Sequence, residues 1–210
     1  MQAKIAAALL DIKAVGFSPQ QPITFKSGLV SPVYVDNRIF PAHPQEWELV
    51  IAGFQQLIAQ QRLEFDLLAG IETAGIPHSA ALGYQLRQPS VFIRKKVKDH
   101  GTKSKIEGGQ VQGKKVLLIE DHVTTGGSSL AGVEALRHDQ AEVADCLAIT
   151  AYGFPEAEKA FAQANVKLHT LTTFPIILEV ALARKLFSPA EKELIESWLQ
   201  EPWSWAERNK

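Results

Sequence analysis

The chain has 210 residues, of which 46% are hydrophobic and 21% are charged. This composition is typical of a globular domain, and it excludes a disordered tail, a collagen-like chain and a low-complexity linker. The net charge of −1 argues against a general nucleic-acid binder, because such proteins are usually basic. The length favours a single domain over residues 1–210 with a sizeable hydrophobic core.

Cysteine content and the lengths of the apolar runs exclude further classes of protein. A single cysteine, Cys146, excludes a disulfide framework and a cysteine-based zinc site, and it is expected to be a small core residue. No run of about 20 apolar residues occurs, and the N-terminal segment lacks the layout of a signal peptide. We therefore expect a cytoplasmic protein that neither spans a membrane nor binds nucleic acid.

Along the chain, residues 3–15 predict a short amphipathic helix. Residues 20–42 are rich in proline and end in the strand-like VYVDNRIF at 33–40. Pro44 then opens a helix, because the apolar residues after it recur at helical spacing and form one face. Those residues are Trp47, Val50, Ile51, Phe54, Leu57 and Ile58.

From residue 66 onward, short apolar runs alternate with helical segments. Strands are predicted at 66–69, 90–93, 115–119, 143–151 and 166–172. Helices are predicted at 75–86, 128–138, 155–163, 175–184 and 189–199. This alternation predicts an α/β fold with a parallel sheet and helices on both faces. Ligands of such sheets bind at the carboxyl ends of the strands, so the loops after residues 69, 93, 119 and 151 are the expected positions of the chemistry.

The segment VLLIEDHVTTGGSS, residues 116–129, contains the strongest functional signal. A buried strand leads to two acids, Glu120 and Asp121, which can accept hydrogen bonds from vicinal hydroxyls or hold a divalent metal. The loop 124–128 supplies hydroxyls, backbone N–H groups and the start of a helix, which together favour a phosphate. The combination fits a ribose 5-phosphate. The alternative interpretation is an ordinary strand-to-helix turn with an N-capping serine.

Residues 94–105, RKKVKDHGTKSK, carry a net charge of +5, whereas the rest of the chain carries −6. A cationic segment in an acidic protein indicates an anionic partner at that place. Taken alone, this segment is most simply explained as a solvated basic surface loop. Because the phosphate-binding segment follows it closely in the chain, a role in binding an anionic substrate is the favoured interpretation.

The acidic pair followed by TTGGS resembles the PRPP-binding motif of the type I phosphoribosyltransferases. Three further segments resemble signatures of the orotate phosphoribosyltransferase family. FKSGLVSPVYVDNR (25–38) resembles its N-terminal signature, RKKVKDHG (94–101) with IEG at 106–108 its mobile catalytic loop, and GIETAGIP (70–77) its pyrophosphate-binding loop. Order and spacing agree from about residue 25 to residue 185.

The resemblance implies a type I phosphoribosyltransferase-like fold, with a parallel five-stranded core sheet flanked by helices. A small N-terminal hood, residues 1–40, would cover the core of residues 41–200. The implied reaction is Mg²⁺-dependent transfer of the phosphoribosyl group of PRPP to orotate, which yields orotidine 5′-phosphate and pyrophosphate in pyrimidine synthesis. The family's mobile loop reaches into the active site of a second subunit, so the resemblance also implies a homodimer with shared sites.

The family's functional positions map onto this sequence residue by residue. Catalytic roles are implied for Lys98, His100 and Asp121, and orotate contacts for Thr124 and Lys26. Mg²⁺ would be held mainly through PRPP, with Glu120 and Asp121 as its protein ligands. For His122 a structural role is the favoured interpretation, although it belongs to the implied PRPP-binding set. That set is Glu72, Thr73, Ala74, Gly75, Arg94, Lys95, Lys98, His100, Glu120, Asp121, His122, Val123, Thr124, Thr125, Gly126, Gly127 and Ser128.

The chemistry of the reaction agrees with this assignment. Negative charge develops on pyrophosphate as it departs, and Arg94, Lys98 and His100 with Mg²⁺ are suited to stabilise it. His100 could also donate a proton, since an imidazole titrates near neutral pH. A closing loop that excludes water would protect PRPP from hydrolysis.

One position departs from the family pattern. Many members place an orotate-binding arginine after the next strand, but residues 148–161, AITAYGFPEAEKAF, contain none. This stretch resembles a second branch of the family, so orotate specificity would rest more on residues 25–38. There, Asp36 and Arg38 either form a structural ion pair or shape the base pocket.

Two rival functions stay open at this point. The nearest is the same reaction on adenine, hypoxanthine or uracil, against which the 25–38 segment argues. The other is a PRPP-sensing regulator that binds nucleic acid and has lost catalysis. Lys98, His100 and the acidic net charge argue against the regulator.

Overall fold

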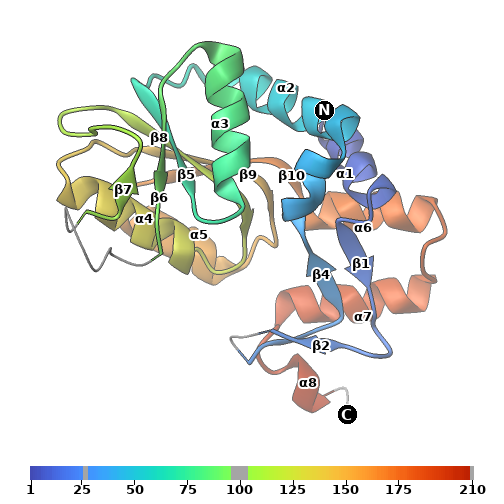
Figure 1. Ribbon diagram of the computed structural model, residues 1–210. Coiled ribbons are helices and arrows are strands. Elements are labelled where there is room, and N and C mark those ends of the chain that lie inside the picture. The colour runs from blue at the N-terminus through green and yellow to red at the C-terminus, as the bar shows by residue number, and fades with distance from the viewer. Residues whose placement is uncertain (26–27, 96–103, 209–210) are drawn as a thin grey trace.

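The computed structural model describes residues 1–25, 28–95 and 104–208 (Figure 1). At its centre is a six-stranded sheet in the order β10-β9-β8-β5-β6-β7. Its strands are β5 (Leu67–Ile71), β6 (Ser90–Ile93), β7 (Ile106–Glu107), β8 (Val116–Val123), β9 (Asp145–Ala151) and β10 (Lys167–Thr173). All neighbouring strands are parallel except β7, which runs antiparallel to β6.

The five predicted parallel strands are confirmed, and β7 is an addition. The chain returns beside β6 after the basic segment, so that Ile93 pairs with Ile106 and Phe92 with Glu107. Two residues are too few to show a strand pattern in the sequence. β6 and β7, the strands on either side of the basic segment, therefore form a hairpin at the edge of the sheet.

Two hydrophobic cores lie on opposite faces of the sheet, because a parallel strand such as β5 is apolar at every position and is buried on both sides. One face packs against α1 (Gln2–Asp11), α2 (Pro44–Gln61), α3 (Gly75–Leu86) and α6 (Phe174–Ala183). The other face packs against α4 (Gly127–His138) and α5 (Pro155–Gln163). Cys146 is a fully buried residue of the second core, as expected.

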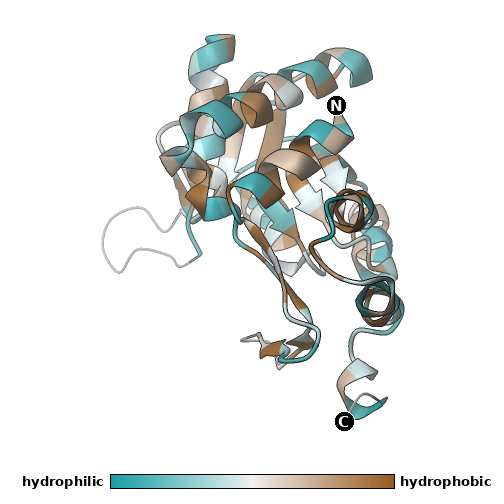
Figure 2. Cartoon of the chain, turned by 90° about the vertical axis from the view of Figure 1, so that its right-hand side faces the viewer, coloured by the Kyte–Doolittle hydropathy of each residue, from teal (hydrophilic) through white to brown (hydrophobic). Residues whose placement is uncertain are grey.

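The smaller part of the molecule, at the lower right of Figure 1, is made from both ends of the chain. β1 (Val15–Phe17) pairs with β4 (Val33–Val35), and β2 (Ile23–Thr24) with β3 (Val30–Ser31). The C-terminal helices α7 (Pro189–Gln200) and α8 (Trp205–Arg208) lie beside these strands. Figure 2 shows the β2–β3 hairpin projecting from the body of the molecule.

Buried aromatic side chains join the strands of the hood, β1 to β4, to the C-terminal part of the chain. Trp198 is fully buried, and its Nε1 donates to the main-chain oxygen of Val30 at 2.9 Å. On β1, Phe17 packs edge-on against Phe187, with ring centroids 4.7 Å apart. The hood strands therefore depend on residues more than 150 positions later in the chain.

The expected strand over 33–40 is wrong in its second half. β4 ends at Val35, and a 3-10 helix, η1 (Asn37–Ala42), follows. Asp36 causes the change, because its carboxylate accepts a hydrogen bond from the backbone N–H of Arg38 at 3.2 Å and caps the new helix. The N-terminal helix is also shorter than expected and ends at Asp11, since Lys13 has a positive φ that breaks it.

Within the described residues, no helix combines the length and the apolar character needed to cross a bilayer.

Candidate active site

Three predicted functional segments meet at one edge of the sheet. Residues 72–75 follow β5, residues 94–95 follow β6, and residues 124–128 follow β8. β6, β5 and β8 are neighbouring parallel strands, so their carboxyl ends lie side by side. This juxtaposition is the one expected for a ligand site in an open α/β sheet.

The acidic pair lies inside β8 instead of after it. The predicted strand ended at Ile119, but pairing with β9 extends it to Val123, with Glu120 opposite Ala148 and His122 opposite Thr150. The extension fixes the backbone of both acids. The two carboxylates therefore extend from a regular strand at the edge of the site.

Glu120 is buried, with 5% of its surface exposed. Its Oε1 accepts the backbone N–H of Asp121 at 3.1 Å, and its Oε2 accepts the hydroxyl of Ser129 in α4 at 3.3 Å. Burial, followed by the charge of Asp121, raises the pKa of Glu120 well above its ordinary value, and burial also raises the pKa of Asp121. Hydroxyl donors or a cation would stabilise the charged forms of this pair.

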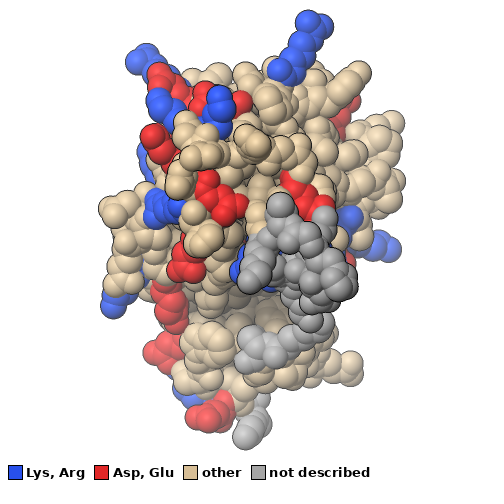
Figure 3. Space-filling model, turned by 60° about the vertical axis from the view of Figure 1, so that its left-hand side comes forward, with Lys and Arg blue, Asp and Glu red and all other residues tan. Residues whose placement is uncertain are grey.

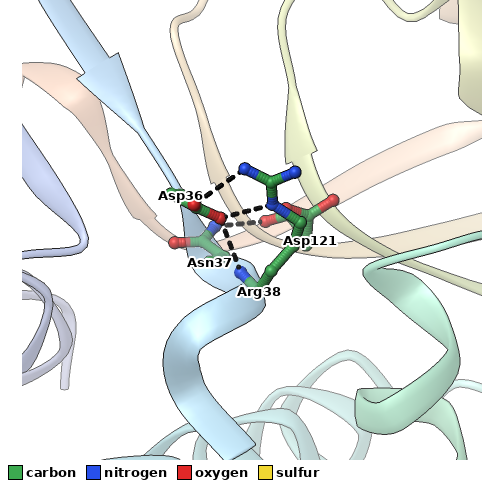
Figure 4. A network of polar contacts seen from close by, with 4 residues as sticks. All are labelled: Asp36, Asn37, Arg38 and Asp121. Atoms are coloured by element: carbon green, nitrogen blue, oxygen red, sulfur yellow. Dashed lines mark hydrogen bonds and ion pairs between the residues drawn. The ribbon is translucent and has the colours of Figure 1, made fainter.

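The hood holds Asp121 through Asn37, the first residue of η1 (Figure 4). The Asn37 side chain is fully buried, and its Nδ2 donates to the main-chain oxygen of Asp121 at 2.8 Å and to Thr150 Oγ1 at 3.3 Å. Sequence reasoning did not identify Asn37. An asparagine between two charged residues gives no signal of its own, because its partners are 84 and 113 residues away in the chain.

Asp36 and Arg38, on either side of Asn37, form a two-pronged ion pair. Arg38 Nε and Nη2 donate to Asp36 Oδ1 and Oδ2 at 2.6 and 2.7 Å. The hydrogen bond from Arg38 lowers the pKa of Asp36, and Asp36 and, more weakly, Asp121 raise the pKa of Arg38. Both groups therefore stay charged at neutral pH.

The loop after β8 has the features of an anion cradle. Gly126 is the N-cap of α4 with φ +84, a conformation that favours glycine, and no side chain caps the helix. Gly127 and Ser128 are exposed, and a Cβ on Gly127 would contact nothing. The alternative of an N-capping serine is wrong, because a glycine occupies the cap, and the first N–H groups of α4 are open to a ligand.

The loop after β5 presents a second helix start beside the first. α3 begins at Gly75, and its N-cap, Ala74, makes no side-chain cap hydrogen bond. A Cβ at Gly75 would overlap the main-chain oxygen of Ile119, so glycine lets the first turn of α3 approach β8. The peptide bond between Glu72 and Thr73 is cis. Two uncapped helix N-termini, each favourable to negative charge, therefore border the acidic pair.

The side chain of Glu72 is turned toward the basic segment, where its Oε2 accepts the backbone N–H of Lys95 at 2.8 Å. Arg94 closes the base of the same hairpin, since its N–H donates to the Lys105 oxygen at 2.8 Å and its Nη1 pairs with Glu107 Oε1 at 3.2 Å. A pocket of about 220 Å³ lies here, and it is lined by Arg94, Lys95, Lys105 and Ser128 together with Ile71, Ile93, Ala131 and Gly132. The expected functional residues Lys98, His100 and Lys26 lie outside the described residues.

His122 has structural contacts in this structure. Its Nδ1 lies 2.8 Å from Thr150 Oγ1, and its ring packs edge-on against Tyr152 with centroids 4.4 Å apart. Burial lowers the pKa of His122 to about 3, so the ring is neutral at working pH. Tyr152 and Phe154, in the segment that lacks the expected arginine, are buried against Trp198.

The remaining described residues that were predicted to bind PRPP fall into two groups. The side chain of Val123 is buried in the core beneath α4 and α5, which leaves only its backbone for a ligand. Thr124 and Thr125 are half-buried, and Thr73 is exposed, all at the edge of the site. The structure thus brings the predicted polar residues of the three loops together.

The donor set suits a magnesium ion that is held chiefly by a substrate. Glu120 and Asp121 are adjacent carboxylates, and among the described residues no group of three or more His, Cys, Asp or Glu side chains could enclose a metal. Mg²⁺ is commonly bound by one or two carboxylates together with substrate phosphates. The residues present fit that arrangement.

Comparisons with known proteins agree with this geometry. A family model described as a phosphoribosyl transferase domain matches residues 39–169. An orotate phosphoribosyltransferase of Coxiella burnetii (strain RSA 493 / Nine Mile phase I) is 39% identical over 202 residues, covering 96% of this chain and 97% of the relative.

Two solved structures share the fold. The orotate phosphoribosyltransferase of Aeropyrum pernix has a TM-score of 0.74 at 28% identity, covering 83% of this chain and 96% of the other. The UMP synthase of Leishmania donovani has a TM-score of 0.81 at 23% identity, covering 94% of this chain but 42% of that protein. The second likeness concerns the fold alone.

Proposed function

The chain belongs to the phosphoribosyltransferase family and within it to the orotate phosphoribosyltransferases, and from this premise we propose how its residues transfer the phosphoribosyl group of PRPP to orotate. The observation that carries the proposal is the acidic pair of β8 between two uncapped helix N-termini. Glu120 and Asp121 accept hydrogen bonds from the ribose hydroxyls. Residues 124–128 bind the 5-phosphate, and the backbone of residues 73–75 lies under the pyrophosphate.

The basic segment between β6 and β7, residues 94–105, supplies the positive charge that stabilises the leaving group. The bond from C1 of the ribose to pyrophosphate breaks and a bond from C1 to N1 of orotate forms, while N1 loses its proton to the departing pyrophosphate or to solvent. Negative charge accumulates on the departing oxygens. We assign its stabilisation to Arg94, Lys95, Lys98 and His100, with His100 able to donate a proton. Lys98 and His100 follow Arg94 by four and six residues in the sequence, and Arg94 lines the pocket beside Ser128.

Mg²⁺ is proposed as the cofactor, bound to PRPP and to Glu120 and Asp121. When bound, the ion neutralises phosphate charge. The two carboxylates then keep the ribose oriented, while Thr124 and Lys26 contact orotate. His122 positions the Thr150 hydroxyl, which also accepts a hydrogen bond from Asn37, and the His122 ring remains neutral.

Ultraviolet absorbance tests the proposed reaction directly, with orotate, PRPP and Mg²⁺ present and with adenine, hypoxanthine and uracil as parallel substrates. Turnover with orotate alone is expected. Turnover with another base would retain the PRPP assignment and overturn the assignment of residues 25–38 to orotate. PRPP binding without turnover would favour the PRPP-sensing regulator that binds nucleic acid. Against that alternative, acidic and basic side chains are interspersed on the face shown in Figure 3, and the described residues form no extended basic surface there.

Lys98→Ala tests the role of the hairpin. If Lys98 acts in the transition state, the variant loses turnover far more than it loses PRPP affinity. Lys103→Ala, which alters a lysine of the same segment without an assigned role, is the matched control. An equal loss of turnover and affinity would overturn a transition-state role, and unchanged turnover would overturn the assignment of Lys98 to the site.

We also propose a cytoplasmic homodimer in which each hairpin serves the partner's site, an arrangement supported by the resemblance of residues 94–101 to the family's mobile loop. Mixing Lys98→Ala with Asp121→Asn subunits tests it. A hybrid dimer with shared sites keeps one intact site, so random mixing restores about a quarter of the original activity. No recovery would show that the hairpin serves its own subunit.

A further inference from the structure

We propose that Arg38 is the specificity-determining residue that binds the carboxylate of orotate. The inference rests on the proposed function, because it assigns one contact within that site. It starts from Arg38, a cation that belongs to the hood but lies near Asp121 of the core (Figure 4).

One edge of the Arg38 guanidinium is occupied and the other is open. Nε and Nη2 bind the two oxygens of Asp36, which fixes the plane and the rotamer of the group. Among the described residues, Nη1 has no hydrogen-bond or ion-pair partner, and 68% of the side chain is exposed. An arginine presents donors on two edges in one plane, so the Nη1–Nη2 edge can bind a second carboxylate in the same two-pronged way.

The backbone places this open edge near the ribose site. Asn37, the residue before Arg38 in the chain, donates a hydrogen bond to the main-chain oxygen of Asp121 at 2.8 Å. The charge of Asp121 also contributes to the raised pKa of Arg38, so the two side chains are close enough to interact. Figure 4 shows the guanidinium and the Asp121 side chain extending into the same space.

Orotate chemistry requires a cation at this place. The carboxylate of orotate is on the ring carbon next to N1, and N1 is the atom that becomes bonded to the ribose. A group that binds the carboxylate must therefore lie beside the acids that hold the ribose hydroxyls. The proposed 5-phosphate loop belongs to the first turn of α4, whereas the hood contacts Asp121 through Asn37, so we assign the base to the hood side.

The charged groups that face Arg38 agree with this role. Asp36 pairs with the guanidinium through both of its carboxylate oxygens and fixes its orientation. An incoming carboxylate then meets a preorganised donor edge, which reduces the entropy lost on binding. Uracil lacks the carboxylate and would leave that edge without a partner, so the contact selects orotate over the unsubstituted base.

Calorimetric titration with two nucleotides isolates the contact, because orotidine 5′-phosphate and uridine 5′-phosphate differ only in the carboxylate. The unmodified protein is expected to prefer orotidine 5′-phosphate. Arg38→Gln is expected to weaken orotidine 5′-phosphate binding by about 10- to 100-fold, the effect of a lost charged hydrogen-bond pair. Uridine 5′-phosphate binding and the KM for PRPP should change by less than about threefold, an effect typical of surface substitutions.

Two further variants separate recognition from folding. Arg38→Lys keeps the charge but loses the planar fork, so its loss should be intermediate. Arg184→Gln changes another arginine that is paired with an aspartate, Asp11 at 2.6 Å, at a position outside the site, and it should leave both affinities unchanged. Retained uridine 5′-phosphate binding shows that each variant is folded.

The outcomes distinguish this inference from the proposed function. If Arg38→Gln weakens both nucleotides equally, or neither, Arg38 is only a structural partner of Asp36 and the inference is overturned. If the unmodified protein turns over orotate but the variant keeps its preference for the carboxylate, the inference alone fails. If the unmodified protein does not turn over orotate, the proposed function fails with it.

Discussion

Replacing Glu120 by glutamine should stabilise the fold while it weakens catalysis. Glu120 is buried beside Asp121, and its pKa is raised, so the ligand-free fold resists the charged form. Glutamine has the same shape and can keep both contacts, from the Asp121 N–H and with the Ser129 hydroxyl. The substitution removes a buried charge without leaving a cavity.

The gain in stability should depend on pH. Above the ordinary glutamate pKa of 4.5, the unfolded chain releases the proton of Glu120 while the folded chain retains it, so stability falls as pH rises through this interval. Glu120→Gln removes that slope. The gain should be small near pH 4.5 and reach about 1–2 kcal/mol at pH 8, or about 2–8 °C in Tm for a domain of this size.

Thermal and urea unfolding at pH 5 and pH 8, without ligands, measure the gain. Glu134→Gln, at an exposed position of α4, is the control and should show no pH-dependent gain. Enzyme assays should show weaker PRPP binding by Glu120→Gln, because an amide replaces a carboxylate acceptor for a ribose hydroxyl. A variant less stable than the original at pH 8, or a gain independent of pH, would refute the reasoning.

Three further substitutions test the geometry of the site and its supports. Gly75→Ala places a Cβ on the Ile119 oxygen, so we expect a loss of about 2–4 kcal/mol in urea unfolding and a displaced pyrophosphate loop; unchanged stability would contradict the close approach. Gly126→Ala is strained at φ +84 and crowds the Phe161 ring at 2.9 Å, so PRPP affinity by calorimetry should fall several-fold together with about 1–2 kcal/mol of stability; an unaltered affinity would argue against this loop as the phosphate site. Trp198→Phe loses the hydrogen bond to a hood main-chain oxygen, so about 1–3 kcal/mol of stability should be lost and the KM for orotate should rise more than the KM for PRPP; equal changes would show that the hood does not depend on this contact.

Features that depend on residues close together in the chain could be predicted from the sequence. Most of the parallel strands contain a short apolar run, and the glycines, hydroxyls and acids of the predicted phosphate loop are contiguous, so the α/β fold class and the position of the candidate site could be predicted from the pattern. The extension of β8 over Glu120 and Asp121 could not be predicted in this way. It depends on pairing with β9, whose residues are about 28 positions later.

The hood contains the remaining differences for the same reason. VYVDNRIF alternates like a strand, but the capping hydrogen bond of Asp36 ends the strand at Val35. The role of Asn37 arises only when η1 packs on the core, and no spacing in the sequence records that contact. Likewise, the pattern cannot show that the carboxylate of Glu72 faces Lys95.

The packing of the hood strands against the C-terminal helices has a consequence for biosynthesis. The phosphate loop and the parallel sheet are complete once β10 has been made, but the hood strands depend on Trp198 and Trp205 for burial. A nascent chain can therefore form the sheet and the loop after β8 before the residues that support the hood strands have been made. On the proposed assignment, the part that selects the base is therefore completed after the part that binds the sugar phosphate.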